Sequence, residues 1–428
     1  MAAGGCWNCW MHDVRMLSEV ERAVLAAVDD ERVVADLREL VRIPSVDGTA
    51  AESDVQVWCA QRLGELGLTV DHWQLDLDDL TADPEFPGME VERTEAWGCV
   101  GVLGGDGTPG LILNGHVDVV PGSEFSARVE DGVVWGRGTC DMKGGVAAII
   151  GAVAAIVASG TQLRKPLAVH TVIGEEDGGA GAFATLRRRH GGDACLIAEP
   201  TAGSVIPANA GSLTFRLEVP GLATHGSTRS RGVNAIEKFT VIQAALQALE
   251  AERNRDPHPL LAHLDLANPL SIGMVRAGDW ASTVPDLLVA EGRYGVRLGE
   301  SLADARQALE DAVAEACAKD DWLREHPATV TWPGGVFASG LLPDDDPLLA
   351  DTVQAVADAG SAAPEVRGAP YGSDLRQYAA AGIPTLQYGP GDVRYAHAAD
   401  EHVVLAEVLQ AARAYALLVV RRCATQLA

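Results

Sequence analysis

The side chains in this chain that could do chemistry are histidines and carboxylates placed at the ends of short apolar segments. One set shares this placement and consists of His116, Asp118, Asp141, Glu175, Glu176, Glu199 and His397. A lone histidine in such a position is most often a satisfied structural residue. Seven such groups brought together without a Lys or Arg would instead repel one another strongly. A bound metal centre is the arrangement that removes this repulsion.

The ligand types narrow the choice of ion. The set contains two imidazoles and several carboxylates but no thiolate, which favours Zn²⁺, with Co²⁺ or Mn²⁺ as alternatives, over Ca²⁺, Mg²⁺ or an iron–sulfur cluster. Asp141 is central in the order of these groups, so we expect it to bridge two metals about 3.5–4 Å apart. Asp118, two residues after His116, can accept a hydrogen bond from the second imidazole nitrogen and fix its tautomer.

Glu175 and Glu176 are adjacent at the end of an apolar segment. Adjacent residues of a strand point to opposite sides, so one carboxylate can bind a metal while the other reaches a bound water. Water held by two metals loses a proton near neutral pH, and a nearby carboxylate can take that proton and pass it to a leaving amine. The alternative for Glu175 is a solvated loop acid.

The segments that must position these groups have the pattern of buried strands. Four are short, apolar and bounded by Gly, Pro or Asp. They are 111–114, 167–173, 194–198 and 383–388. A core helix is expected over 146–158, between the first two. The carboxyl ends of parallel strands open onto one crevice, so groups hundreds of residues apart can meet there. The expected fold class is α/β, a mostly parallel sheet with helices on both faces.

The pattern of apolar and polar residues changes in the middle of the chain. Apolar residues alternate with polar ones over 213–219, as in a strand with one wet face, and a helix follows over 236–249. Two strands, a second helix and a last strand come next, at 270–276, 287–298, 302–318 and 328–332. This β-α-β-β-α-β order indicates an inserted α+β domain. The expected division is a loose tail over 1–17, a metal-binding catalytic domain over 18–206 and 337–428, and the inserted domain over 207–336.

The composition argues against nucleic acid and membranes as partners. The 428 residues include 60 acidic and 33 basic ones, a formal charge of −27 that repels phosphate backbones and anionic lipids. The apolar run 146–158 is too short for a spanning helix. The N-terminal residues lack the pattern of a secretory signal, so a cytoplasmic location is expected. The eight cysteines are scattered and expected to be reduced, and Cys6 and Cys9 lack the second pair of a zinc finger.

Eight stretches, in order along nearly the whole chain after about residue 30, resemble motifs of the metal-dependent M20 peptidases and deacylases. They are NGHVDVVP (114–121), GRGTCDMKGG (136–145), GEED (174–177), AEPT (198–201), GLATHGS (221–227), STVPD (282–286), YGSDLR (371–376) and GPGDVRYAHAADE (389–401). This family includes acetylornithine deacetylase, succinyl-diaminopimelate desuccinylase, aminoacylase and carboxypeptidase G-type enzymes. The resemblance implies two metals, one held by His116, Asp141 and Glu199 and the other by Asp141, Glu176 and His397.

The resemblance also implies roles for other residues. Glu175 would be the general acid/base, and Asp118 the partner of His116. His225 would stabilise the oxyanion of the tetrahedral intermediate, although taken alone it reads as an ordinary surface histidine. Arg293 would bind the carboxylate of the substrate, because its planar guanidinium can donate two hydrogen bonds to such a group. The alternative that the strand pattern offers for Arg293 is a cross-strand salt bridge.

Some positions depart from the pattern or have no catalytic role in it. Ser282 stands where many relatives have Asn, which leaves the oxyanion or substrate contact at that point undefined. Cys140 reads as a buried small hydrophobe, and Lys143 as a structural residue. The resemblance implies a cis peptide bond between Asp141 and Met142.

Together these observations predict a dinuclear zinc hydrolase that cleaves the amide bond of a small N-acyl amino acid or a related N-acyl compound. A hydroxide that bridges the metals would attack the carbonyl, with Glu175 as the general base. The resemblance implies a homodimer formed through the inserted domain, which would also serve as a lid. Two alternatives stay open: an exopeptidase on the same fold, and a non-catalytic binding protein. The chain lacks the phosphate-binding motif G-x-x-x-x-G-K-[ST] and the nucleophile elbow G-x-S-x-G.

Overall fold

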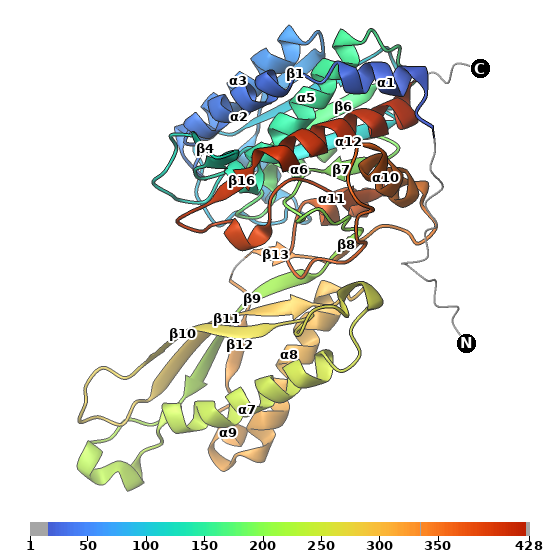
Figure 1. The fold of residues 1–428 in the computed structure, drawn as a ribbon. Coiled ribbons are helices and arrows are strands. Elements are labelled where there is room, and N and C mark those ends of the chain that lie inside the picture. The colour runs from blue at the N-terminus through green and yellow to red at the C-terminus, as the bar shows by residue number, and fades with distance from the viewer. Residues whose placement is uncertain (1–15, 334, 425–428) are drawn as a thin grey trace, which may run out of the picture. The chain divides into compact units, whose positions relative to one another are not determined.

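The computed structural model describes residues 16–333 and 335–424. These residues form two compact units, each with its own sheet and helices (Figure 1). The first unit comprises the described residues up to Ala208, together with Leu341–Arg367 and the described residues from Ser373 onward. The second comprises Asn209–Gly340, without residue 334, and Gly368–Gly372. Cys6 and Cys9 lie outside the described residues.

A six-stranded sheet forms the centre of the first unit. Its strands, in spatial order, are β1 (Thr69–Gln74), β2 (Trp97–Leu103), β6 (Leu167–Val172), β3 (Leu111–His116), β7 (Cys195–Ile197) and β15 (Thr385–Gln387). β3 is parallel to β6 and β7, and β15 is parallel to β7. β1 and β2 pair in antiparallel fashion at one edge. The sheet is therefore mostly parallel, and the four predicted buried strands are confirmed.

Helices lie on both faces of this sheet (Figure 1). They are α1 (Glu19–Ala26), α2 (Asp30–Arg42), α3 (Ala50–Glu65), α4 (Leu77–Ala82), α5 (Gly144–Ala158), α6 (Ala180–Arg187), α10 (Pro347–Asp358), α11 (Leu375–Ala380) and α12 (Leu405–Cys423). α2 begins after Asp29, whose carboxylate accepts a hydrogen bond from the backbone N–H of Arg32. The remaining short strands are β4 (Arg128–Glu130), β5 (Val133–Trp135) and β16 (His402–Val404), which form one small sheet, and β8 (Ala208–Asn209) and β14 (Gly340–Leu341).

The helix α5 is the core helix predicted from its apolar run. Residues Thr139–Ala158 are long and apolar enough to cross a membrane, but 83% of that window is buried inside the protein. α5 packs against α12 and α2. Among residues 16–333 and 335–424 it belongs to the one segment that meets the length and hydropathy criteria for a membrane span. Apolar side chains all round a helix are typical of one enclosed by the rest of a core.

Gly145 determines how closely α5 approaches the chain that follows β7. A Cβ at Gly145 would lie 2.2 Å from the carbonyl oxygen of Ala198. We therefore expect Gly145→Ala to lower the free energy of unfolding by about 1–3 kcal/mol, because backbone atoms must move apart. Gly64→Ala in α3 is the matched control, since its Cβ would meet nothing within 4 Å and alanine is the better helix former. Thermal and denaturant unfolding measure the difference, and a Gly145→Ala protein as stable as the wild type would contradict the expectation.

The second unit has the predicted β-α-β-β-α-β order. Its elements are β9 (Gly211–Pro220), α7 (Ala235–Arg253), β10 (Leu270–Ala277), β11 (Leu287–Val296), α8 (Leu302–Lys319), α9 (Asp321–Glu325), β12 (Thr329–Thr331) and β13 (Val336–Phe337). The sheet order is β10-β11-β9-β12, and β13 also pairs with β9. Along β9 every second residue from Gly211 to Val219 is buried, as a strand with one wet face requires. The core of this unit includes Phe215, Ile242 and Tyr294.

Candidate metal centre

The seven predicted histidine and carboxylate residues all lie in the first unit, and five of them lie at or just after the ends of its strands. They are His116 at the end of β3, Asp118 just after it, Asp141 in the kinked turn Thr139–Lys143, Glu175 and Glu176 after β6, Glu199 after β7, and His397 between β15 and β16. β6, β3 and β7 are parallel neighbours, so their carboxyl ends open onto the same edge of the sheet. The sheet topology thus brings to one place groups that are far apart in the sequence.

Asp141 lies between the two imidazoles. Nε2 of His116 is 3.0 Å from Oδ1 of Asp141, and Nε2 of His397 is 3.5 Å from Oδ2. Nε2 of His397 is also 3.0 Å from Oε1 of Glu176. A separate imidazole therefore faces each oxygen of one carboxylate, which is the arrangement that a bridging ligand between two metals requires.

Two groups of potential ligand atoms surround His116. One consists of His116, Glu175 and Glu199, and the other of His116, Asp141 and Glu176. Within each group the ligand atoms lie within 4.8 Å of one another. Glu175 and Glu199 are buried, at 8% and 5% exposure. Both groups are thus compact enough to surround an ion, and they share one imidazole.

The electrostatics of the cluster show an excess of negative charge. Burial, followed by repulsion from Glu199, raises the pKa of Glu175 well above its usual range. Burial and the charge of Asp141 raise the pKa of Glu199 in the same way, and they raise the pKa of Glu176 to about 7. Divalent cations would neutralise these carboxylates and allow them to ionise together. The donor set and its charge therefore fit a metal centre.

The ring of His116 is fixed by the chain of Asp118. Nδ1 of His116 is 3.1 Å from the backbone carbonyl oxygen of Asp118 and 3.6 Å from its carboxylate Oδ1. The carbonyl is therefore the closer acceptor for a proton on Nδ1, which leaves the Nε2 lone pair directed at the metal position. Oδ2 of Asp118 instead accepts a hydrogen bond from the backbone N–H of Glu176 at 3.2 Å. Asp118 thus links the segment that carries His116 to the segment that carries Glu176.

The kinked turn around Asp141 has the features that the resemblance and the sequence predict. The Asp141–Met142 peptide bond is cis. Cys140 is buried, and its thiol donates to the carbonyl oxygen of Asp392 at 3.3 Å rather than facing a metal position. The ammonium of the buried Lys143 donates to the carbonyl oxygens of Leu40 and Ile43, at 3.1 and 2.8 Å. Lys143 therefore ties this turn to the C-terminal end of α2.

Glu401 and Arg137, for which the sequence predicted no role, hold the segments that carry Asp141 and His397. Oε1 of Glu401 accepts hydrogen bonds from the backbone N–H groups of Cys140 and Asp141, at 3.0 and 3.1 Å. Glu401 also pairs with Arg137, which donates to the carbonyl oxygen of His397 at 3.2 Å. The pair therefore connects the turn that carries Asp141 with the loop that carries His397. Both residues lie inside motifs quoted above.

Asp374 is a further carboxylate that the sequence did not single out, although it lies in the YGSDLR motif. It is buried, and its Oδ2 has no hydrogen-bond partner among the residues that the structure describes. Burial raises the pKa of Asp374 to about 6, against the opposing charge of Arg376. Asp374 in turn contributes to the raised pKa of Glu175. It is thus part of the electrostatic environment of the proposed acid/base.

His225 and Arg293 lie in the second unit. His225 is exposed and caps the short helical turn Gly226–Arg231. Arg293 is exposed on β11 and donates to the hydroxyls of Thr214 and Ser212 on β9, at 2.9 and 2.6 Å. The cross-strand ion pair on that face joins Glu291 to Arg216 at 2.7 Å.

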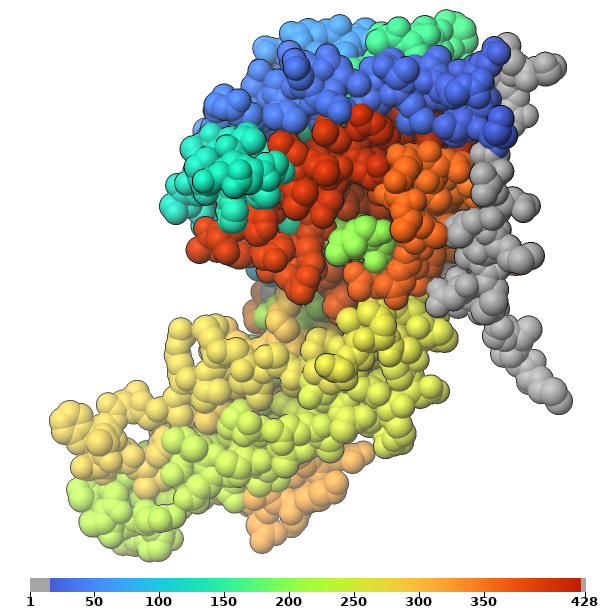
Figure 2. All heavy atoms as spheres, in the orientation of Figure 1, coloured from blue at the N-terminus to red at the C-terminus, as the bar shows by residue number. Residues whose placement is uncertain are grey.

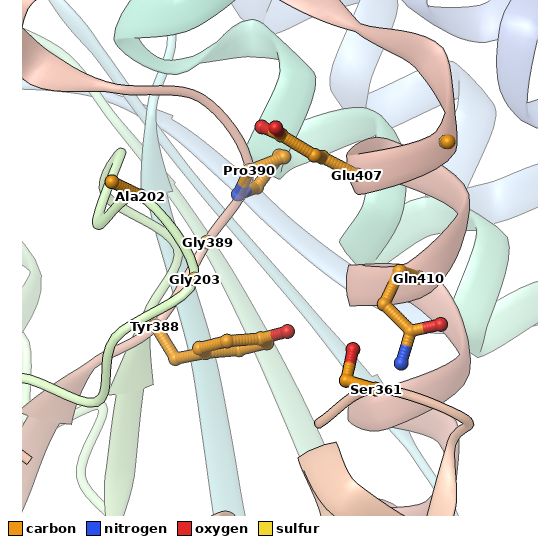
Figure 3. A pocket seen from close by; sticks show the side chains of 9 residues that line it. Ala202, Gly203, Ser361, Tyr388, Gly389, Pro390, Glu407 and Gln410 are labelled. Atoms are coloured by element: carbon orange, nitrogen blue, oxygen red, sulfur yellow. The ribbon is translucent and has the colours of Figure 1, made fainter. Parts of the chain in front are cut away.

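A hollow of about 310 Å³ lies beside the first turns of α12 (Figure 3). Its wall includes residues 202–203, which follow Glu199 along the chain, and 389–390, which precede His397. Figure 2 shows the segment near residue 200, in green, surrounded on the surface by the red and orange C-terminal segments. The backbone N–H of Ala202 donates to the carbonyl oxygen of Gly391 at 2.8 Å, which joins these segments. None of the predicted site residues lines this hollow.

Comparison with known proteins gives matches over most of the chain. A family model described as peptidase family M20/M25/M40 matches residues 112–421. The succinyl-diaminopimelate desuccinylase of Gluconacetobacter diazotrophicus is 32% identical over 342 residues, which cover 73% of this chain and 81% of that protein. The N-formyl-4-amino-5-aminomethyl-2-methylpyrimidine deformylase of Halalkalibacterium halodurans is 27% identical over 429 residues, which cover 92% of this chain and 95% of that protein.

Solved structures share the fold. An aminopeptidase from Bacillus cereus has a TM-score of 0.72 at 19% identity, covering 92% of this chain and 98% of the other. A dinuclear metal-binding peptidase of the M20 family from Bacillus subtilis has a TM-score of 0.64 at 17% identity, with the same coverage of 92% and 98%.

Proposed function

Because the chain belongs to peptidase family M20/M25/M40, a family of amide-bond hydrolases, we propose that it is a two-metal amidohydrolase that acts on a small N-acyl amino acid or a related N-acyl compound. Its products would be a carboxylate and an amine. The observation that carries the proposal is the position of Asp141, with a separate imidazole against each of its carboxylate oxygens.

The proposed ligand sets are those that the resemblance to M20 enzymes implies. His116, Asp141 and Glu199 would hold one ion, and Asp141, Glu176 and His397 the other. Nitrogen and oxygen donors without a thiolate suit Zn²⁺, with Co²⁺ or Mn²⁺ as alternatives. Two such ions, when bound, polarise the carbonyl of the substrate and lower the pKa of bound water.

Glu175 is proposed to accept a proton and deliver it to the leaving amine. Its buried position beside Glu199 raises the pKa of its carboxyl group, and a general base works best when its pKa lies close to the working pH. Asp118 would keep the ring of His116 in place through its backbone carbonyl. His225 is proposed to stabilise the oxyanion, and Arg293 to bind the carboxylate of the substrate.

Removal of the metals is the experiment that tests this function. We expect a chelator to abolish hydrolysis and added Zn²⁺ or Co²⁺ to restore it, because the proposed reaction depends on metal ions to polarise the carbonyl and to activate water. The screen should include N-formyl, N-acetyl and N-succinyl substrates beside dipeptides. The deformylase and desuccinylase names of the relatives support the acyl substrates. Activity on dipeptides alone would favour the exopeptidase, and full activity in a sample shown to be metal-free by elemental analysis would contradict the proposal.

We also propose a homodimer that forms through the second unit and a cytoplasmic location. β10 is an edge strand of its sheet, and its Met274 and Val275 are 47% and 50% exposed, as in an edge that pairs with another chain. The six cysteines among the described residues are all free and buried, which is typical of proteins in a reducing compartment. Analytical ultracentrifugation tests the dimer.

A further inference from the structure

A buried arginine underlies the turn that carries Glu175 and Glu176. Arg93 lies between α4 and β2, and its side chain is inaccessible to solvent, with 0% exposure. Its guanidinium donates to Oδ2 of Asp177 at 2.7 Å, to Oε1 of Glu52 at 2.9 Å and to Oδ1 of Asp47 at 3.0 Å. Asp47 and Glu52 belong to one segment of the chain, and Asp177 belongs to another. One guanidinium therefore joins the turn after β6 to the start of α3 and to the loop before it.

The segment that carries Arg93 also holds the turn through its backbone. Oδ2 of Asp177 accepts a second hydrogen bond from the N–H of Val91 at 2.9 Å, and the carbonyl oxygen of Asp177 accepts one from the N–H of Glu90 at 3.0 Å. A Cβ at Gly178 would lie 2.2 Å from the carbonyl oxygen of Gly88. The turn that carries Glu175 and Glu176 thus packs directly against residues 88–93.

The charges around Arg93 make the contact strong. Desolvation disfavours a buried guanidinium, yet the hydrogen bonds to Glu52 and Asp177 hold the pKa of Arg93 above its usual value. Charge-assisted hydrogen bonds to a planar fork fix direction as well as distance. A lysine could keep the charge but not serve three carboxylates with this geometry.

We propose that Arg93 is a positioning residue that acts through Asp177 on Glu175 and Glu176, an inference that rests on the proposed function. Asp118 holds the same turn from the other side, by accepting the N–H of Glu176. With both anchors in place, one carboxylate of the turn faces His397 and the other lies beside His116. If the contact between Arg93 and Asp177 is lost, the turn can shift. Glu175 and Glu176 then both leave the positions that their proposed roles require.

The test is a set of matched variants of the full chain. We expect Arg93→Lys and Asp177→Asn to lower kcat by about 10–100-fold, because an error of about 1 Å in position can cost 10²-fold. KM should stay within about threefold, since the variants leave the substrate contacts in place. Titration of the metal-free protein with Co²⁺, followed by visible absorption, should show that the Co²⁺ affinity of one site falls by about tenfold. Loss of a group that orients a metal ligand has an effect of this size.

Arg62→Lys is the control for a general loss of stability. Arg62 pairs with the buried Asp36 between α3 and α2 at 3.1 Å, so this variant makes the same substitution in another arginine–carboxylate pair without touching the turn. It should keep wild-type kcat and Co²⁺ affinity. If Arg93→Lys does not fold, Asp177→Asn, which is isosteric, decides the question.

Glu175→Gln in the same series separates the two hypotheses. If Glu175→Gln is inactive while Arg93→Lys and Asp177→Asn have wild-type kcat and Co²⁺ affinity, the positioning role is overturned and the proposed function stands. If Glu175→Gln is fully active, the proposed role of Glu175 as acid/base fails, whereas full activity of the metal-free protein is the result that contradicts the proposed function.

Discussion

Glu175→Gln is expected to lower kcat by about 10²–10⁴-fold, the range by which a positioned acid/base accelerates proton transfer. The amide has the same shape as the carboxylate but cannot take a proton from water. Glu175 is buried beside Glu199, which raises the pKa of its carboxyl group, so the substitution also removes repulsion. Metal content, measured by elemental analysis, should therefore stay at two ions per chain. Steady-state kinetics on the best N-acyl substrate measures the effect.

Glu65→Gln is the matched control for this prediction. Its side chain is 66% exposed at the end of α3, and the substitution removes the same charge far from any proposed ligand. It should leave kcat unchanged. A Glu175→Gln protein that holds two metals and hydrolyses substrate at the wild-type rate would refute the proposed role of Glu175.

Asp141→Ala is expected to empty both metal sites. Both imidazoles face the carboxylate of Asp141, at 3.0 and 3.5 Å, so its loss removes one donor from each proposed ion. The affinity for each ion should fall by more than about 100-fold, since even the loss of an outer partner of a ligand costs 10–100-fold. Activity should fall to the background. Competition with a chelating dye measures the affinities.

His397→Ala provides the contrast, because His397 is assigned to only one of the two ions. This variant should lose one metal and keep the other, held by His116, Asp141 and Glu199. If Asp141→Ala binds two ions as tightly as the wild type, or if both variants lose the same single ion, then Asp141 does not bridge.

The parts of the fold that follow from periodic patterns could be predicted from the sequence. Buried strands leave short apolar runs, and β3 and β6 are buried at every position. The parallel order of the strands then places their carboxyl ends together, so the convergence of His116, Glu175 and Glu199 follows from where the runs stop. The sequence is sufficient to predict this convergence, because the order and direction of the strands determine where their ends lie.

Contacts between single buried charges could not be predicted in this way. Arg137 and Glu401 are 264 residues apart, and Arg93 lies in a segment without regular periodicity. A buried ion pair leaves no repeat in the sequence, since either partner alone reads as a surface residue. The preference of His116 for the carbonyl of Asp118 over its carboxylate depends on a difference of 0.5 Å between 3.1 and 3.6 Å, which only coordinates give.

The span between Glu176 and His397 bears on how the enzyme matures. The two side chains meet although 221 residues separate them, and the entire second unit is made within that interval. In the proposed centre, a ribosome must therefore translate past residue 397 before the second ion can find its full set of donors. The other proposed ion, held by His116, Asp141 and Glu199, needs no donor beyond residue 199, so the two proposed sites would be completed at different stages of synthesis.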